Sequence, residues 1–361
     1  MERVVDASNA ISTDADGETL FGLYIGFREL IDSAKASVAS YSEMFSYADQ
    51  LATVIDETQE TASDEALTNA AEVYDKVITG YEDGSFSTSQ ADSMVLVMRM
   101  AITQLRIPDA VAGDEAPVDV TSVIVNPNYD NEDNEGWSGS SPLHQRYQNA
   151  EFYNTNFDMY QVIYGLPEGT YEVRISGFYR TLGTAEETYD KRKESNDTIN
   201  AFLYAESGGV VSSVPLMSIL DDYSTSGLNN GVDEVQLEDE MYVPNQMVTS
   251  AMYFENGYYS DNSVFCKVTD GTLKIGLKKN VTNGGDWAIF DNWKLFYYGG
   301  DSSHEADGDA SGIEGIEEDE VVSRTYYTLG GVPSSVPVKG VNIVKSVMSD
   351  GTVRISKILV K

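Results

Sequence analysis

Histidine and cysteine are almost absent from this sequence, and their scarcity argues against several kinds of chemistry. The 361 residues include two histidines, His144 and His304, and one cysteine, Cys266. A single cysteine cannot form an internal disulfide, and two histidines leave little imidazole for a zinc site or a Ser-His-Asp triad. Cys266 stands among apolar residues with no histidine near it in the sequence, so we expect a buried thiol that does not react.

Positive charge is also scarce. The chain has 23 lysines and arginines against 59 aspartates and glutamates, which gives a formal net charge of −36. Such a charge repels phosphate backbones and anionic lipid head groups, so we expect no nucleic-acid partner. No apolar run approaches the roughly 18 residues that a bilayer span needs, and residues 1–20 lack the pattern of a signal peptide. We therefore expect no membrane insertion.

The N-terminal third carries apolar residues at helical spacing. Two stripes cover 67–81 and 91–105, a shorter helix is expected at 45–55, and Ser87-Thr-Ser-Gln90 has the form of a capping box. Residues 1–112 are therefore predicted to form a bundle of three or four helices whose stripes pack as core. The first stripe advances by alternating steps of four and three residues through Leu20, Tyr24, Phe27, Ile31, Ala34, Val38 and Tyr41.

From Val118 the apolar period changes to two, and turn residues recur every 8 to 15 positions. Short strands at this spacing, with no helices expected between them, favour a β-sandwich of jelly-roll type over residues 117–300. Parallel βαβ topology is not expected. The candidate strands are 118–125, 159–164, 171–179, 200–205, 246–254, 264–268, 273–277 and 287–298.

The last 61 residues consist of an acidic segment followed by a basic one. Residues 301–323 contain nine acids and no lysine, arginine, Phe, Trp or Tyr, which predicts a linker extended by its own charge. Residues 324–361 carry six cations and one acid, Asp350, and alternate apolar with polar residues, which predicts a small β module. The fold class expected for the whole chain is thus multidomain, a helical bundle followed by all-β parts.

Three segments of the tail follow a distinctive order. They are Tyr327-Thr-Leu-Gly-Gly-Val-Pro333, Lys339-Gly-Val-Asn-Ile-Val-Lys345 and Val353-Arg-Ile-Ser-Lys-Ile-Leu-Val-Lys361. In this order the tail resembles the C-terminal type A sorting domain of the type IX secretion system of Bacteroidota. The resemblance implies export across the outer membrane, to the medium or the cell surface, with the secretion machinery as a partner. The alternative is a small β cap on the sandwich.

Two segments of the middle region carry a second resemblance. Ile124-Val-Asn-Pro-Asn-Tyr-Asp130 with Gly136-Trp137 stands at its start, and Gly285-Asp-Trp-Ala-Ile-Phe-Asp-Asn-Trp-Lys-Leu295 stands at its end. The region is similar to the carbohydrate-binding modules of jelly-roll type on Bacteroidota surface and secreted proteins. That likeness implies a structural calcium between first and last strands, with Asp130 and Asp291 as ligands and Asn126 as a weaker one. Alternatively, Asp291 only binds neighbouring backbone.

Sugar recognition needs flat aromatic faces together with amides and carboxylates, and this region supplies both. Trp137 lies among turn formers, so an exposed ring there would be a stacking platform unless it turns inward. Trp287 and Trp293 alternate in phase with Ile289 and Leu295, which favours core packing. Further candidates for sugar contact, all in polar surroundings, are Tyr147, Tyr153, Tyr258 and Tyr259.

No catalytic motif stands out in the sequence. Acid pairs such as Asp221-Asp222 are too frequent in this chain to mark a glycosidase, and no nucleophile elbow, phosphate-binding loop or His-Glu-x-x-His motif occurs. The sequence therefore favours a non-catalytic protein that binds a glycan. The alternatives are a structural or adhesive surface module without a glycan site, and an accessory fragment of a larger glycoside hydrolase.

Overall fold

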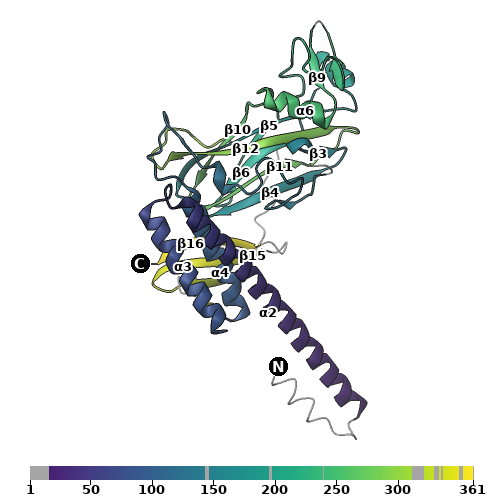
Figure 1. Cartoon of the computed structure of the whole chain (residues 1–361). Coiled ribbons are helices and arrows are strands. Elements are labelled where there is room, and N and C mark those ends of the chain that lie inside the picture. Colours follow the sequence, from purple (N-terminus) through teal and green to yellow (C-terminus); the bar gives the residue numbers. More distant parts are fainter. Residues whose placement is uncertain are drawn as a thin grey trace.

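A computed structural model gives the fold and describes residues 16–142, 146–194, 197–238, 240–310, 321–328, 333–334, 336–348 and 353–360. Helices occupy the N-terminal part and antiparallel sheets the rest (Figure 1), so the chain belongs to a mixed α and β class. The expectation of N-terminal helices followed by β structure is confirmed. Within the described residues, no helix combines the length and the hydropathy that crossing a bilayer requires.

Three helices form the N-terminal bundle: α2 (Gly17–Thr58), α3 (Asp64–Glu82) and α4 (Thr88–Arg106). The predicted capping box is present, since Gln90 N donates to Ser87 Oγ and Ser87 N donates to Gln90 Oε1. A separate helix at 45–55 was a wrong expectation, because α2 continues unbroken to Thr58 with its apolar face in the bundle core. That core includes Met44, Ala48, Leu51, Ala70, Val77, Met94, Met98 and Leu105.

Two antiparallel sheets follow the bundle. The first sheet contains β1 (Val118–Asp119), β12 (Trp287–Gly299), β5 (Gly169–Arg180) and β10 (Asn262–Val268) in that order, with β3 (Ala150–Tyr153) also on β12. The second sheet has the order β2 (Ser138–Gly139), β4 (Phe157–Tyr164), β11 (Thr272–Lys279), β6 (Ala201–Ser207) and β7 (Val210–Pro215). Short 3-10 helices, η1 (Thr121–Val123) and η2 (Arg146–Gln148), stand in the connections.

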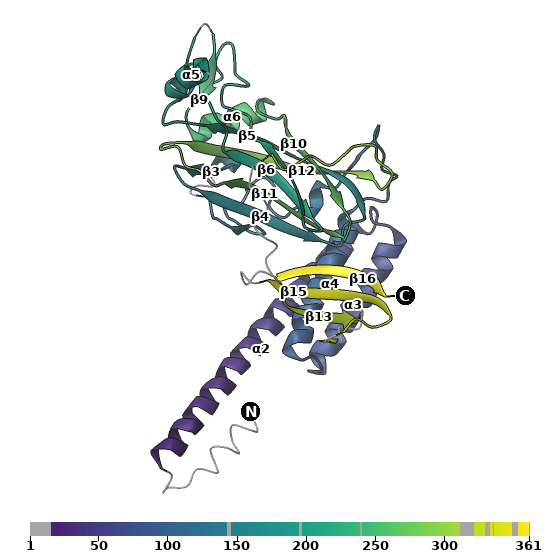
Figure 2. The ribbon, with the colours of Figure 1, turned by 180° about the vertical axis from the view of Figure 1, so that it is seen from behind.

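The two sheets face each other across one apolar core (Figure 2). Alternate residues of each strand point into it, as the period of two predicts. Cys266 is one of the buried members, and burial raises the pKa of its thiol to about 12, so the expectation of a buried, unreactive cysteine is supported. Other members are Met159, Ile163, Tyr171, Val173, Leu203, Leu273, Ile275, Phe290, Trp293 and Leu295.

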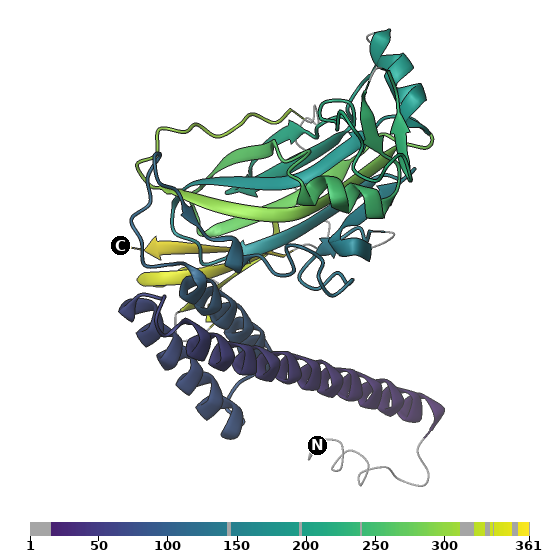
Figure 3. The same ribbon diagram turned by 45° about the horizontal axis from the view of Figure 1, so that its top comes forward.

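Two helices interrupt the β region where none was expected: α5 (Ala185–Lys193) and α6 (Met247–Glu255). The strand predicted at 246–254 is wrong, because this segment is α6. Its residues Tyr253 and Phe254 pack with Phe178 and Ile289 on the outer side of the first sheet, so burial on that surface decides the conformation. A small two-stranded sheet, β8 (Glu234–Gln236) with β9 (Tyr242–Pro244), lies beside these helices (Figure 3).

The first ten residues of the predicted acidic linker are bound to the two-sheet domain. Asp307 N donates to Phe265 O of edge strand β10 at 2.9 Å, and Asp307 Oδ2 accepts from Phe265 N at 2.7 Å. At the next residue, Ser213 N of edge strand β7 donates to Gly308 O at 3.0 Å. The prediction of a linker extended by its own charge is incomplete for 301–310, because hydrogen bonds from its backbone and from an acidic side chain hold this segment on two open sheet edges. Residues 311–320 lie outside the described part.

The tail forms a four-stranded antiparallel sheet in the order β14 (Pro333–Ser334), β13 (Val321–Thr328), β15 (Gly340–Met348) and β16 (Val353–Val360). It lies beside α4 and below the second sheet in Figure 2. Leu96 of α4, Tyr327 of β13 and Ile343 of β15 bury one another in a small apolar cluster. The tail thus packs chiefly on the helical bundle.

Candidate functional site

The outer face of the second sheet carries an unusual combination of aromatic and charged side chains. In β4 the inward residues Phe157, Met159 and Ile163 are buried, and the intervening residues of the strand point outward. The outward row consists of Asp158, Tyr160, Val162 and Tyr164. One strand therefore delivers a carboxylate and two tyrosine rings to the same open surface.

Gly276 makes room for the aromatic part of this surface. In the sheet it is paired with Tyr160 on one side and with Tyr204 on the other. A Cβ atom at Gly276 would stand 2.8 Å from the Tyr204 ring, so the ring lies against the glycine where any larger residue would displace it. Tyr204 Oη donates to Asp158 Oδ1 at 2.7 Å, which fixes the ring in this orientation.

Two lysines lie over these rings. Lys274 Nζ is 4.1 Å from the centre of the Tyr160 ring and 5.3 Å from that of Tyr204, and Lys278 Nζ is 5.1 Å from that of Tyr204. Burial under these side chains leaves Tyr204 only 2% exposed and raises the pKa of its hydroxyl well above the ordinary value. Tyr204 therefore stays a neutral donor, and Tyr160 is the less buried of the two rings, with Lys274 over its face.

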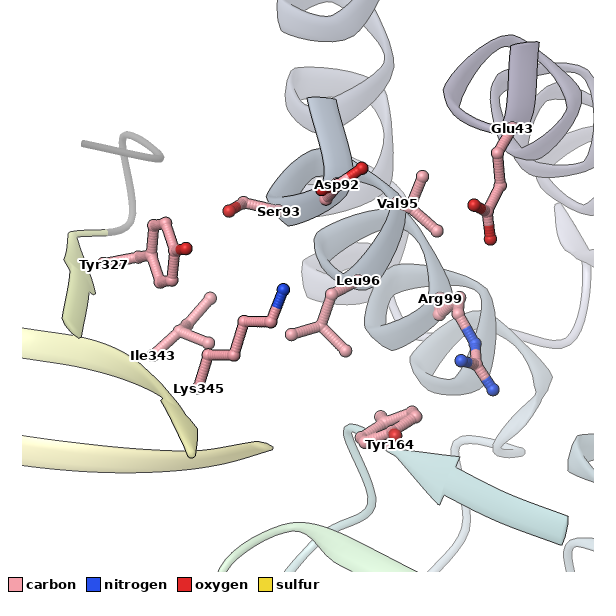
Figure 4. Close-up of a pocket in the computed structure, with 10 residues that line it drawn as sticks. All are labelled: Glu43, Asp92, Ser93, Val95, Leu96, Arg99, Tyr164, Tyr327, Ile343 and Lys345. Atoms are coloured by element: carbon pink, nitrogen blue, oxygen red, sulfur yellow. The ribbon is translucent and has the colours of Figure 1, made fainter. Parts of the chain in front are cut away.

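The outward row of β4 leads to a cavity at the end of the sheet. The guanidinium of Arg99 lies 4.7 Å from the centre of the Tyr164 ring and donates to Val162 O at 3.2 Å, which joins α4 to β4. Beyond Tyr164, a cavity of about 300 Å³ opens between α4, β4 and the tail (Figure 4). Its lining combines Arg99 and Lys345 with the carboxylates of Glu43 and Asp92. Such a mixture suits a small polar ligand that carries many hydroxyl groups.

A second candidate site surrounds Asp291, near the end of β3 and under α6. Asp291 is 6% exposed, and burial, with Asp130 and Glu255 nearby, raises the pKa of its carboxyl to about 8. Within the described part of the chain, Asp291 Oδ1 has no hydrogen-bond partner. Because Ala150 pairs with Phe290, the next residues along this ladder are Asn149 and Asp291.

Two more buried side-chain oxygens near α6 also lack a hydrogen-bond partner among the described residues. Asn149 Oδ1 and Thr249 Oγ1 are fully buried and, among the described residues, have no partner. Asn149 Nδ2 donates to Met247 O at 2.9 Å, which ties the start of β3 to the start of α6. Buried polar atoms normally find a partner, so three orphaned oxygens in this region fit a cation that prefers oxygen ligands.

The structure places the three predicted calcium ligands differently from one another. Asp130 lies close enough to Asp291 to raise its pKa, although Asp130 itself is exposed and accepts from Gln148 Nε2 at 3.0 Å. The Asn126 side chain is used elsewhere, since its Nδ2 donates to Asp133 O and to Asp133 Oδ1. Among the described residues, no group of three or more His, Cys, Asp or Glu side chains is close enough to hold a metal ion. A calcium ion here would therefore need amide and hydroxyl oxygens as well as carboxylates.

The five predicted sugar contacts are not brought together. Trp137 is 9% exposed and packs on Trp293 with ring centres 4.5 Å apart, so the ring turns inward and offers no stacking platform for a sugar. Tyr259 is fully buried with its hydroxyl on Ile219 O, and it offers no surface either. Tyr258 is partly buried against Tyr253.

Only the other two predicted tyrosines are exposed. Tyr147 is 51% and Tyr153 is 45% exposed, and they lie at opposite ends of β3. Sequence reasoning did not single out Tyr160, Tyr204, Lys274 or Gly276. The available signal was the alternation of Asp158, Tyr160, Val162 and Tyr164, together with a glycine inside a strand, which often marks close approach of another group.

Neither of two comparisons with known proteins finds a relative of this chain. No known protein family matches this sequence. A search of curated proteins also finds no significant match.

Proposed function

We propose that this chain is a non-catalytic protein that binds a glycan on the outer face of its second sheet. The observation that carries the proposal is the half-buried ring of Tyr160 with Lys274 over its face and with Asp158 and Glu206 nearby; a sugar that stacks on this ring displaces the lysine from it. A pyranose has one apolar face, which an aromatic ring can cover, and a rim of hydroxyl groups, which bind carboxylates and ammonium groups. Lys274 Nζ lies 3.8 Å from Glu206 Oε2, so a cation and an anion flank the same ring.

The cavity beyond Tyr164 extends this binding face. At about 300 Å³ it lies at the lower end of the range for small-molecule pockets. In our proposal, one sugar unit lies on Tyr160 and the next units follow the outward row of β4 toward Arg99 and Lys345. The chain of contacts would favour an oligosaccharide over a single sugar.

The strand order supports a jelly-roll sandwich as the finer description of the two-sheet domain. In chain order, β3, β5, β10 and β12 belong to the first sheet, whereas β4, β6, β7 and β11 belong to the second. With the two-residue strands β1 and β2 there are five strands in each sheet, and this interleaved division between two sheets is typical of a jelly roll. This is the fold on which the resemblance to carbohydrate-binding modules depends.

We also propose that a calcium ion binds beside Asp291 and stabilises the fold. Three orphaned buried oxygens, those of Asp291, Asn149 and Thr249, support it, as does the nearby Asp130. Calcium takes six to eight oxygen ligands and accepts amides and backbone carbonyls among them. Bound calcium would supply the positive charge that lets Asp291 ionise in this buried place. Asn126 is not part of this set.

For cellular location, we propose export to the medium or the cell surface of a bacterium of the Bacteroidota. The tail's resemblance to a type IX sorting domain supports this, with the secretion machinery as its partner. The docked position of the tail on α4 is compatible with an address that is also a folded module.

The test is binding of the full chain to a panel of plant, host and microbial polysaccharides by affinity electrophoresis, with and without a calcium chelator. We expect retardation by one class of glycan. In the Tyr160→Ala variant we expect affinity to fall about tenfold, equivalent to ~1.4 kcal/mol. Tyr153→Ala is the control, because it removes an exposed tyrosine from the other sheet and should bind as the unaltered chain does.

Three results would contradict the proposal. Binding that depends on Tyr153 and not on Tyr160 would move the site to the end of β3. No retardation across a broad panel would instead support a structural or adhesive module. Release of reducing sugars by the full chain would contradict the non-catalytic assignment, and would favour a part of a larger glycoside hydrolase.

A further inference from the structure

Helix α2 is much longer than the helices it packs against. It has 42 residues, whereas α3 and α4 have 19 each. At 1.5 Å per residue these lengths are about 63 Å and about 28 Å. Contacts with the start of α4 include Ser37 Oγ, which lies 2.7 Å from Thr88 Oγ1, and Tyr41 Oη, which donates to Phe86 O. The N-terminal half of α2 projects beyond the bundle (Figures 1 and 3).

This projecting half exposes large apolar side chains. Phe21 and Val38 are 65% and 67% exposed, and both lie on a helix whose polar residues do not cover them. Single exposed apolar residues are common, but a row of them marks an interaction surface. The other large apolar side chains exposed on this half are Leu20, Tyr24, Ile25, Leu30 and Ile31.

Four of these residues, Leu20, Tyr24, Ile31 and Val38, belong to a stripe that has the spacing of a coiled-coil seam. Its steps of four and three residues place Tyr24, Ile31 and Val38 at the a positions of a heptad repeat. Leu20, Phe27 and Ala34 then occupy the d positions. β-Branched residues at a, as in Ile31 and Val38, favour two parallel strands.

The charges beside the seam also favour a parallel pair of helices. The e positions carry Arg28 and Lys35, whereas the g positions Leu30 and Ser37 are uncharged. A parallel pair sets e against g, so no like charges meet; an antiparallel pair sets e against e and would bring the cations together. Residues 17–41 hold three acids and two bases, so this segment is nearly neutral in a chain of net charge −36. Two copies of the chain therefore repel each other less along this segment than along the strongly acidic remainder of the chain.

We propose that α2 pairs with α2 of a second copy of this chain in a parallel two-stranded coiled coil. Six seam side chains on each helix, at about 100 Å² each, would bury about 1,200 Å², at the lower end of the range for stable interfaces. Residues 1–15 are less suited than a second copy of α2 to cover this seam, because they include no Leu, Phe, Tyr or Trp. The pairing would give the glycan-binding face two copies per particle, but it does not depend on that function.

The test is the molecular mass of the full chain in solution, measured by sedimentation equilibrium from 1 to about 100 μM. We expect a dimer that dissociates on dilution. Ile31→Glu with Val38→Glu places charges in the seam and should give a monomer at every concentration. Ile25→Glu is the matched control, because it changes an exposed aliphatic residue of the same helix at a b position. It should leave the dimer intact, and an unchanged melting temperature would show that each variant folds.

Orientation is tested by a cysteine at the far end of the seam. Leu20→Cys should form an intermolecular disulfide under mild oxidation only when the helices are parallel. Cys266 is 2% exposed and does not compete. A monomer at 100 μM would overturn the proposal, as would a dimer that survives the double glutamate variant. A dimer without the Leu20→Cys cross-link would overturn the parallel arrangement.

Discussion

Trp137 and Trp293 pack with ring centres 4.5 Å apart in the core between the two sheets. Trp137 Nε1 donates to Asn126 O at 3.2 Å, and Trp293 N donates to Pro127 O at 3.1 Å. The first hydrogen bond closes the loop that precedes β2 on itself, and the second, together with the ring packing, fixes that loop to β12. The role of Trp137 is in folding.

Trp137→Ala should destabilise the fold. Loss of a buried tryptophan leaves a cavity and removes its contacts, which costs about 3 kcal/mol or more in the free energy of unfolding. Urea denaturation of the full chain, followed by tryptophan fluorescence and circular dichroism, measures it. Tyr147→Ala, at a 51% exposed position, is the control and should change stability by less than about 0.5 kcal/mol. Equal stability of the two variants would contradict the burial of Trp137.

The Asp291 carboxyl should make stability depend on pH in the absence of calcium. Its pKa in the folded protein is raised from 3.8 to about 8, first by burial and then by Asp130 and Glu255. Between these values the folded state holds a proton that the unfolded state has lost, so stability falls as pH rises from about 4 to about 8. Melting temperatures in chelator at pH 5 and pH 8 measure the loss, and Asp291→Asn should flatten the difference. An identical slope in that variant would assign the pH dependence to other groups.

Calcium should reverse this loss. A cation beside Asp291 favours the ionised carboxylate, so added calcium should raise the melting temperature more at pH 8 than at pH 5. Asn149→Leu and Asp291→Asn should each abolish the gain, whereas magnesium should give little because it demands a smaller octahedral site. Asn126→Ala serves as the control, and it should keep the calcium response. Equal stabilisation of all variants would place the ion elsewhere.

Lys279 and Asp286 form a buried ion pair that holds the end of β11 to the start of β12. Lys279 Nζ lies 2.5 Å from Asp286 Oδ2, and the two side chains are 1% and 0% exposed. Tyr179 Oη also donates to this oxygen at 2.8 Å. Lys279→Met should lower the free energy of unfolding by about 3–5 kcal/mol, because it leaves a buried carboxylate without its cation.

The double variant Lys279→Met with Asp286→Leu tests the cause. Removal of both charges should recover a large part of the loss, as double-mutant cycles by urea denaturation can show. Lys193→Met is the control, since its pair with Asp190 is solvent-exposed and contributes little to stability. A double variant as unstable as Lys279→Met would mean that the loss comes from packing rather than from the unpaired charge.

The tail should separate from the bundle when its apolar contact is broken. Leu96, Tyr327 and Ile343 are each less than 9% exposed, and Leu96→Asp would put an unpaired charge among them. Limited trypsin digestion should then cut faster at Arg324, Lys339 or Lys345, while the two-sheet domain resists as before. Ser89→Asp places the same charge on an exposed part of α4 and should change nothing. Equal digestion rates would argue against docking through Leu96.

Local signals in the sequence were enough for much of the fold. Helical stripes gave α3 and α4, the capping box at Ser87 was recognisable from four residues, and alternation located β5, β11 and β12 to within a few positions. These signals are local because each depends on backbone hydrogen bonds or on one apolar face within a short segment. Prediction failed at α6, where burial against Phe178 and Ile289 decides the conformation.

The sequence by itself determined the order of helical and β regions, the burial of the single cysteine among apolar residues and the excess of acidic charge. Only the tertiary structure decided that Trp137 is buried, that 301–310 binds two sheet edges, and that Tyr160 and Tyr204 share a face across Gly276. Each of these depends on a partner far away in the sequence. The sequence around a loop tryptophan, an acidic segment or a strand tyrosine is the same whether or not that partner exists. The local pattern determines which way a side chain points, but it does not determine which distant residues that side chain contacts.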